Sequence, residues 1–340
     1  MHVYHEMIRE VLSYGTRKEN RTGVDTLSTF NFNYELCWDP AIYNVCRDPM
    51  HIRNDHCYLV DRPEAGPGYA IPLLTTKDIS WKNIVVELLW FLSGDPHIDF
   101  LKQHRCKFWD DWAENRTVPS AYGNFWRHFP THEGPIHYSA GGVELDMPNG
   151  SPGFNDQIAW ALGELRRNPM SRRLVVSAWA PGNAQKSKLP PCHMMFALNV
   201  QLVEQDGKLE QRLCMHLSQR SCDLALGVPY NMASYGLLLL IFSHLTGIKP
   251  GIFAHTLLDL HIYTSKPDGS KAEYDHLPGL REQLLREPRT LPRITIDPSI
   301  KELSDIEALM KPDVSTSAIL EKFRLEGYDP HPAIKFKVAV

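Results

Sequence analysis

The chain has 340 residues, of which 43% are hydrophobic and 22% charged, a composition typical of globular proteins and unlike that of disordered or fibrous ones. A net charge of −4 argues against general nucleic-acid binding, so DNA is not an expected partner and an anionic ligand needs a local arginine cluster. The longest apolar run is too short to span a membrane, and an odd number of cysteines without an export signal predicts free thiols in a cytoplasmic protein.

The predicted elements mix helices and strands. The first clear element is a helix over residues 80–93, where apolar side chains recur at helical spacing and Glu87 lies among them. Later β-branched and apolar runs predict strands, and Asp206-Gly207 predicts a hairpin turn between two of them. Because the elements do not alternate regularly, we predict an α+β fold. After the first helix they are strands at 174–179, 194–203 and 209–217, a helix at 235–245 and a strand at 253–263.

Two segments have the composition of loops inserted into this framework. Residues 38–70 are rich in proline and glycine, and residues 131–153 are rich in glycine, proline and histidine. Neither has linker composition at both ends, so we predict one domain over residues 1–340 that carries both insertions. Possible metal ligands lie in or beside the first insertion, but their spacing matches no zinc pattern, which favours an ordinary loop. These residues are Cys37, Cys46, His51, His56 and Cys57.

Cys192 is a candidate nucleophile, since it follows two prolines and precedes His193 and a predicted strand. Buried, inert cysteine is the commoner outcome for such a tripeptide. Pairing of the predicted strands, however, can bring Arg220 close to the thiol, and a guanidinium favours the thiolate. A cysteine–histidine hydrolase would also need an orienting base and an oxyanion hole, which the sequence does not locate.

Glu87 and Asn231 are the next candidates. A carboxylate on an apolar helix face is either buried in an ion pair, for example with a lysine, or available for proton transfer. Asn231 stands near the head of a predicted helix, so it is either the N-cap or a ligand-binding amide. An amide can accept from N3–H of uracil and donate to O4, whereas cytosine presents the reverse pattern.

Arginines and tryptophans provide two further candidate groups. Four arginines, scattered in the sequence, are either solvated surface charges or, together with Ser221, parts of a phosphate site. Trp109 and Trp112 either belong to the core or form a flat wall for a heteroaromatic ring. The four arginines are Arg21, Arg172, Arg173 and Arg220.

Many of these residues lie in motifs that resemble those of the thymidylate synthase family. The motifs occur in the family's order along nearly the whole chain, apart from the two insertions and residues 264–275. Two departures are Ala180, where asparagine is usual, and Leu257-Leu258, where glycine is usual. The matching motifs include Arg21-Thr22-Gly23, Thr75-Thr76-Lys77, Glu87-Leu88-Leu89-Trp90-Phe91-Leu92, Trp109-Asp110-Asp111-Trp112, Tyr122-Gly123, Ser171-Arg172-Arg173, Pro191-Cys192-His193, Gln219-Arg220-Ser221-Cys222-Asp223, His261-Ile262-Tyr263 and Gly327-Tyr328-Asp329-Pro330-His331-Pro332.

The resemblance implies an enzyme of nucleotide biosynthesis, a methyltransferase that converts dUMP to dTMP with 5,10-methylenetetrahydrofolate as co-substrate and no metal. Cys192 would add to C6 of the pyrimidine beside Arg220, while Glu87 and Tyr122 would manage proton transfers. The implied fold is a large mixed sheet packed by helices, with one sheet face forming a homodimer interface.

The resemblance also assigns residues to each ligand. Arg172 and Arg173 would reach the phosphate site of the other subunit, and Asn231 would read uracil. The full dUMP set is Arg21, Arg172, Arg173, Arg220, Ser221, Asp223, Asn231, His261 and Tyr263. The folate set is Lys77, Trp109, Trp112, Asp223 and Val340.

Two alternatives differ in what the same scaffold does. In a 5-hydroxymethylase, water in place of hydride quenches the methylene intermediate. Asn231 argues against a cytosine substrate, and Trp109 with the Val338-Ala339-Val340 ending favours hydride transfer. A non-catalytic nucleotide-binding protein is the other alternative, but the intact nucleophile and phosphate cluster argue against it.

Overall fold

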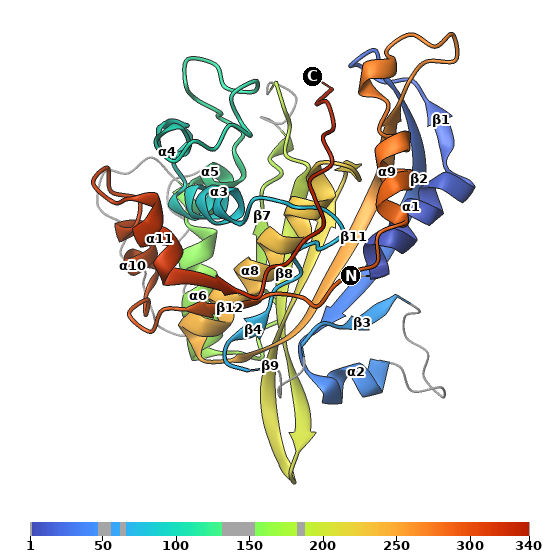
Figure 1. The fold of residues 1–340 in the computed structure, drawn as a ribbon. Coiled ribbons are helices and arrows are strands. Elements are labelled where there is room, and N and C mark those ends of the chain that lie inside the picture. Colours follow the sequence, from blue (N-terminus) through green and yellow to red (C-terminus); the bar gives the residue numbers. More distant parts are fainter. Residues whose placement is uncertain (1, 47–55, 62–65, 131–153, 182–187, 340) are drawn as a thin grey trace.

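A large mixed sheet is the centre of the computed structural model, which describes residues 2–46, 56–61, 66–130, 154–181 and 188–339 (Figure 1). Eight strands form this sheet in the order β1-β2-β11-β9-β8-β7, with β10 paired to β11 and β3 paired to β2. They are β1 (Thr16–Lys18), β2 (Asp25–Cys37), β3 (Cys57–Leu59), β7 (Val175–Ser177), β8 (His193–Gln205), β9 (Lys208–Gln219), β10 (Cys222–Asp223) and β11 (Lys249–Thr264). Smaller sheets contain β4 (Tyr69–Ala70), β5 (Phe129–Pro130), β6 (Phe154–Asn155), β12 (Arg293–Ile296) and β13 (Phe323–Glu326).

Helices pack against the sheet to form the main hydrophobic core. The longest, α8, crosses the sheet and is apolar on all sides, as expected for a buried helix. No described helix combines the length and the apolar character needed to cross a bilayer. The helices are α1 (His2–Tyr14), α2 (Pro40–Cys46), α3 (Trp81–Ser93), α4 (Asp99–Gln103), α5 (Tyr122–Arg127), α6 (Gln157–Arg167), α8 (Gly227–Thr246), α9 (Leu277–Leu284), α10 (Leu303–Ala308) and α11 (Thr316–Lys322).

The predicted α+β fold is confirmed, and local signals explain where its elements begin and end. The side chain of Ser80 accepts the N–H of Asn83 at the start of α3, and Gly94 ends this helix at a φ of 75°. Between β8 and β9, Asp206 and Gly207 have φ values of 52° and 73°. Two consecutive positive φ angles produce the tight hairpin turn that this dipeptide predicts.

The first insertion is more ordered than the sequence predicts, because its described part contains α2, β3 and β4. Strand β3 adds to β2 in parallel, with Glu35 opposite Cys57. Ile42 of α2 packs with Ile252 on the sheet face opposite the main core, since the next residue of β11, Phe253, lies in that core. Elements this short have too few residues to show periodicity. The second insertion lies outside the described residues, and β5 pairs with β6 beside it.

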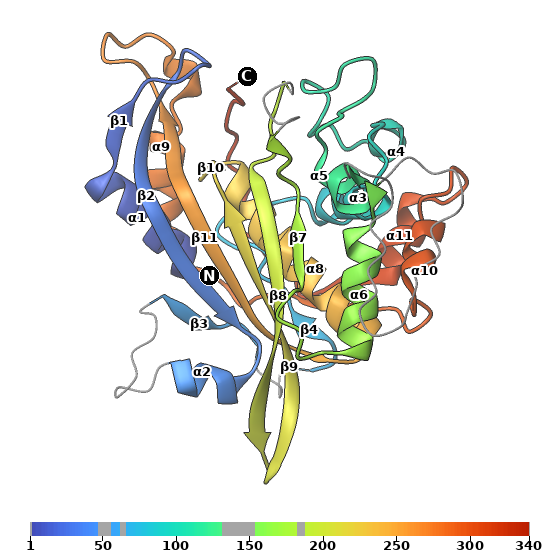
Figure 2. The same cartoon turned by 180° about the vertical axis from the view of Figure 1, so that it is seen from behind.

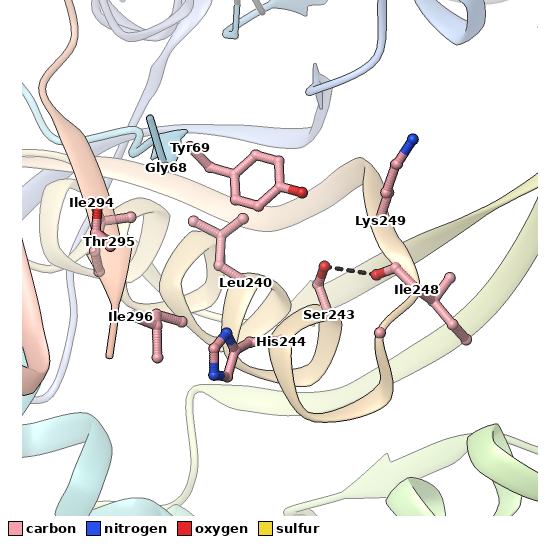
Figure 3. Close-up of a pocket in the computed structure, with 11 residues that line it drawn as sticks. Gly68, Tyr69, Leu240, Ser243, His244, Ile248, Lys249, Ile294, Thr295 and Ile296 are labelled. Carbon is pink, nitrogen blue, oxygen red and sulfur yellow. Dashed lines mark hydrogen bonds between the residues drawn. The ribbon is translucent and has the colours of Figure 1, made fainter. Parts of the chain in front are cut away.

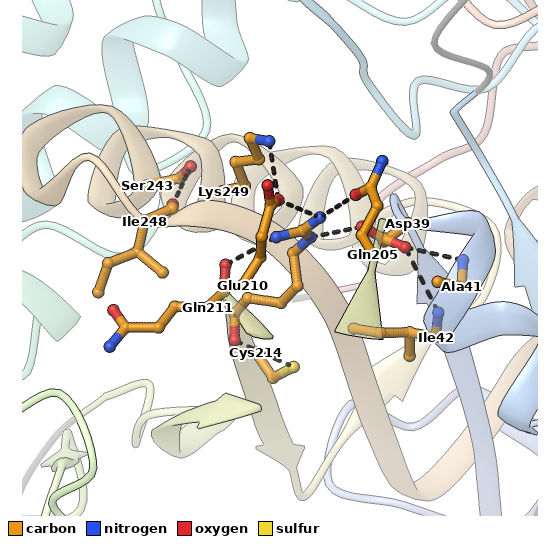
Figure 4. A network of polar contacts seen from close by, with 11 residues as sticks. Asp39, Ala41, Ile42, Gln205, Glu210, Gln211, Cys214, Ser243, Ile248 and Lys249 are labelled. Atoms are coloured by element: carbon orange, nitrogen blue, oxygen red, sulfur yellow. Dashed lines mark hydrogen bonds and ion pairs between the residues drawn. The ribbon is translucent and has the colours of Figure 1, made fainter. Parts of the chain in front are cut away.

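Charge pairs with buried partners fasten the first insertion to the rest of the protein, and Figure 4 shows the network around Asp39. Arg212 of β9 is only 2% exposed and donates to Asp39, which caps α2 by accepting the N–H of Ala41 at 2.7 Å. At the other end of the segment, Asp61 accepts from Arg293 at 2.5 Å. Such pairs hold a segment in one position because separating them leaves a charge buried.

The metal interpretation of the cysteines and histidines gains no support from the described residues. The sulfurs of Cys37 and Cys57 are 3.2 Å apart, and His56 contacts Glu6 at 3.0 Å. The side chain of Cys46 and the whole of His51 fall outside the described part. Within that part, no group of three or more suitable side chains is arranged to hold a metal ion.

Candidate active site

Cys192 lies at the start of β8, beside the end of β9. The strand register places His193 opposite Gln219, and the carbonyl of Cys192 accepts the N–H of Arg220 at 2.9 Å. Nη2 of Arg220 is 3.9 Å from Sγ of Cys192. The guanidinium is held in place by the carbonyls of Pro191 and Pro190, at 2.9 and 2.7 Å. The predicted meeting of thiol and guanidinium is therefore confirmed.

The pKa of the Cys192 thiol reflects two opposing influences. Burial raises it, whereas the charge of Arg220 and hydrogen bonds from Tyr122 and Ser221 lower it. Burial is the larger influence, so the pKa lies above its ordinary value. Arg220 acts in the direction predicted from the sequence, but it does not by itself produce a thiolate.

Glu87 faces the interior from α3 and is 9% exposed. Its carboxylate accepts a hydrogen bond from Nε1 of Trp109 at 2.7 Å, and among the described residues no cation pairs with it. The lysine ion pair considered above is therefore not seen in the described part of the chain. Burial raises the pKa of Glu87 to about 7, although the bond from Trp109 acts the other way. A carboxyl group with this pKa can gain or lose a proton near neutrality.

Aromatic rings surround Glu87 on this side of the site. Trp109 is buried and lies edge-on to Phe91 and Tyr122, with ring centroids 6.0 and 5.7 Å apart. The Tyr122 hydroxyl accepts the backbone N–H of Cys192 at 3.1 Å. Trp112 is half-buried and has the guanidinium of Arg21 over its ring at 5.7 Å. The two tryptophans thus have different positions, because Trp109 is in the core and Trp112 packs half-buried against it.

Asn231 is not the N-cap of α8, because it lies inside the helix. The carboxylate of Asp223 instead accepts the N–H groups of Ala225 and Leu226, at 2.9 and 3.2 Å, just before the helix begins. The side-chain oxygen of Asn231 accepts from Gln219 at 3.0 Å. The amide is therefore held by a side chain of β9 and does not cap the helix.

His193 and Gln219 are part of the site but were not among the predicted residues. His193 stacks on Tyr122 with ring centroids 4.4 Å apart. Burial lowers its pKa to about 4, although a hydrogen bond with Asn231 acts the other way, so the ring is neutral at pH 7. Their signal in the sequence is that each directly neighbours Cys192 or Arg220 and lies in the same family motif as that residue.

The remaining residues predicted to bind dUMP differ in how they interact with the site. Arg21 is exposed, and its positive charge lowers the pKa of the Cys192 thiol. Within the described chain, no side-chain hydrogen bond or ion pair joins the exposed Arg172 or Arg173 to the site. His261 and Tyr263 lie two residues apart on β11, with perpendicular rings 5.3 Å apart.

Lys77 and the C-terminal segment lie next to Asp223. The Lys77 ammonium is buried, donates to the carbonyl of Ala225 and lies 4.7 Å from the ring of Phe336. Burial lowers its pKa to about 8, although Asp223 acts the other way. Its expected contact with a glutamate tail stays a prediction, since the ammonium points inward here. Val340 falls outside the described residues.

A separate cavity of about 340 Å³ lies at the other end of α8 (Figure 3). Apolar side chains such as Leu240 and Ile294 line it, and Lys249 at its rim already pairs with Glu210. The cavity contains neither a thiol nor an arginine cluster. We therefore take the region around Cys192, where a thiol, a cation and a titratable carboxyl group occur together, as the candidate active site.

Comparison with known families identifies the family of the chain. The family model described as thymidylate synthase matches residues 64–340, which is most of the chain. The match includes Glu87, Cys192 and Asn231, whereas Arg21 and most of the first insertion precede it. The resemblance inferred from the motifs is thereby confirmed.

Proposed function

The chain belongs to the thymidylate synthase family, and we propose that it catalyses the reductive methylation of dUMP to dTMP. The observation that carries the proposal is the position of the Cys192 sulfur 3.9 Å from Arg220. Glu87 and Asn231 belong to the same site. A thiol, a fixed cation, a titratable acid and a bidentate amide are what covalent activation of a uracil ring requires.

Cys192 would begin the reaction as a nucleophile. Its sulfur bonds to C6 of dUMP, the thiol proton leaves, and the C5–C6 π electrons move onto C5 and O4. This enolate makes C5 reactive toward a one-carbon electrophile, so one difficult step is divided into easier ones. The sulfur leaves C6 at the end, when the C5–C6 double bond re-forms. Arg220 stabilises negative charge on the sulfur at both stages.

Glu87 and Tyr122 are proposed to move protons around the ring. Because its pKa is raised to about 7, Glu87 can donate toward O4 as the enolate forms and accept again later, acting through water. The Tyr122 hydroxyl, beside the backbone of Cys192, can assist removal of the C5 proton. Both groups are buried, which limits proton exchange with bulk water.

Phosphate and sugar would be bound by the polar residues around the thiol. Arg21, Arg220 and Ser221 supply charge-assisted hydrogen bonds to the phosphate, and His261 with Tyr263 binds the 3′-hydroxyl. We propose a homodimer, in which Arg172 of the partner subunit and Arg173 of the partner subunit complete the phosphate site. Their exposure in one chain fits this role.

The co-substrate 5,10-methylenetetrahydrofolate would supply both the carbon and the hydride. Asp223 fits a heterocycle there, because its Oδ2 has no hydrogen-bond partner among the described residues while Oδ1 holds the start of α8. Trp109 would shield this side of the site from water, with Trp112, Lys77 and Val340 as further contacts of the folate.

Product identification by mass spectrometry tests the proposal. Protein incubated with dUMP and 5,10-methylenetetrahydrofolate should yield dTMP together with dihydrofolate. The appearance of 5-hydroxymethyl-dUMP with tetrahydrofolate would instead identify the hydroxymethylase. As a control, Cys192→Ala should abolish both products while dUMP still binds, because the phosphate and base contacts do not involve the thiol. Turnover by this variant would contradict the covalent mechanism.

A further inference from the structure

A chain of hydrogen bonds runs from Asn231 into the core of the sheet. Nε2 of Gln219 donates to Oδ1 of Asn231 at 3.0 Å, and Oε1 of Gln219 contacts Nε2 of His255 at 3.0 Å. Nδ1 of His255 then contacts the Tyr34 hydroxyl at 2.8 Å. Gln219 is 2% exposed, and His255 and Tyr34 are each 1% exposed. We call these three residues behind Asn231 the relay.

Each hydrogen bond of the relay has a defined direction. Nε2 of Gln219 also donates to the backbone carbonyl of Ser221 at 3.0 Å, and a carbonyl can only accept. Oε1 must therefore face His255, whose Nε2 carries the proton. Burial lowers the pKa of His255 well below its ordinary value, so the ring is neutral and has a single proton. Its Nδ1 accepts from the hydroxyl of Tyr34.

The direction of the relay fixes which way the amide of Asn231 points. Its oxygen must meet the donor on Gln219, which leaves the amide NH₂ to donate elsewhere. Rotating the amide by half a turn would place two donors against each other. The same rotation would make an amide that binds uracil bind cytosine instead, because the two bases present opposite patterns of hydrogen-bond donors and acceptors. Asn231 alone therefore does not determine which base is read.

We infer that Tyr34 and His255 are positioning residues that enforce the choice of uracil over cytosine by holding Gln219, and through it Asn231, in one orientation. This inference rests on the proposed function. Neither residue contacts Asn231 in the relay, so each acts through its neighbour.

Tyr34 contributes by selecting the tautomer of His255. If the imidazole proton moved to Nδ1, Nε2 and Oε1 of Gln219 would become two facing acceptors. The Tyr34 hydroxyl would also lose its acceptor, and His255 is its hydrogen-bond partner among the described residues. A buried hydroxyl without a partner is unfavourable. Removing this hydroxyl removes that constraint, and within the described part of the chain the Ser221 carbonyl is then the group that orients the Gln219 amide.

Nucleotide binding without turnover tests the inference. In a Cys192→Ala background, titration calorimetry gives the dissociation constants of dUMP and dCMP. Tyr34→Phe should weaken the preference for dUMP. The ratio of the dissociation constant of dCMP to that of dUMP should fall about tenfold, the effect of one lost buried hydrogen bond. Tyr4→Phe is the matched control. It also removes a buried phenolic hydroxyl, one that donates to the Leu224 carbonyl at 2.7 Å outside the relay, and should leave the ratio unchanged.

A second variant reverses the relay. Gln219→Glu presents only acceptors, so Asn231 should turn its NH₂ toward it and bind dCMP better relative to dUMP. If the Cys192→Ala parent prefers dUMP and Tyr34→Phe keeps the same ratio, the relay does not set specificity, although the proposed function stands. If the parent itself shows no preference for dUMP, the proposed substrate fails together with the inference.

Discussion

Two buried polar networks are built on the same three-strand region of the sheet and differ in charge. At the active-site end, Gln219 of β9 and His255 of β11 form a neutral relay with Tyr34 of β2. Further along these strands, which lie side by side in Figure 2, Arg212 of β9 pairs with Asp39 just after β2. The first network lies behind the candidate active site, and the second fastens the first insertion.

The difference in charge determines what each network can do. Amides and imidazoles have a donor end and an acceptor end, so their orientation can be reversed and has to be specified. A guanidinium has only donors and a carboxylate only acceptors, so the pair of Arg212 and Asp39 has one possible polarity. We therefore expect the neutral network to control recognition and the charged network to control stability alone.

The largest effect is expected at Glu87, a buried carboxyl group at the active-site end that changes charge near neutrality. Glu87→Gln keeps the shape and removes the proton exchange, so kcat should fall about 10²–10⁴-fold. Because the pKa of Glu87 is about 7, the parent rate should show an inflection near this pH that the variant lacks. Steady-state kinetics from pH 5.5 to about 8.5 measures both effects. An unchanged kcat would show that the reaction does not need proton exchange at Glu87.

Arg212→Met should cause the next largest effect, this time on stability. Removing one partner of a buried ion pair leaves the Asp39 carboxylate uncompensated, so the free energy of unfolding should drop by about 3 kcal/mol. Urea denaturation measures the drop, and adding Asp39→Asn should restore part of it. The ratio of dCMP to dUMP affinity should stay at the parent value. A changed ratio would mean that the two networks are coupled.

Acid should affect the two networks differently, since only the neutral one contains histidine. The pKa of His255 is below its unfolded value, so between these values the unfolded chain binds more protons and stability falls as the pH drops below about 6.5. His255→Gln should reduce this slope by at most about 1.4 kcal/mol per pH unit, the limit for one proton, which is approached as the pH falls well below about 6.5. Glu87→Gln should instead increase the slope from about pH 4.5 to 7. Because the folded pKa of Glu87 is raised, the folded chain binds the extra proton in this range, and the parent therefore loses stability from this group as the pH rises. Urea midpoints at pH 5.0, 5.75 and about 6.5 measure both slopes.

The sequence predicts the chemically distinctive parts of the site better than the networks that orient them. Helix α3 and the β8–β9 hairpin follow from periodicity and turn chemistry, and the meeting of Cys192 with Arg220 follows from pairing of these strands. The relay could not be predicted, because Tyr34 and His255 are 221 residues apart and become neighbours only through the pairing of β2 with β11. The inserted α2 and β3 were missed because such short elements depend on tertiary contacts for their structure.

The smallest effect is expected at the outer edge of the charged network. Lys249 pairs with Glu210 at 3.0 Å, but its side chain is 58% exposed. Glu210 keeps its ion pair with Arg212 at 2.9 Å and is partly exposed to water, so Lys249→Met should leave the urea midpoint nearly unchanged. Arg212→Met, one step further inward, provides the contrast within the same network. A large loss of stability in Lys249→Met would show that the charged network acts as one unit. Burial of Arg212 alone would then not explain the strength of the network.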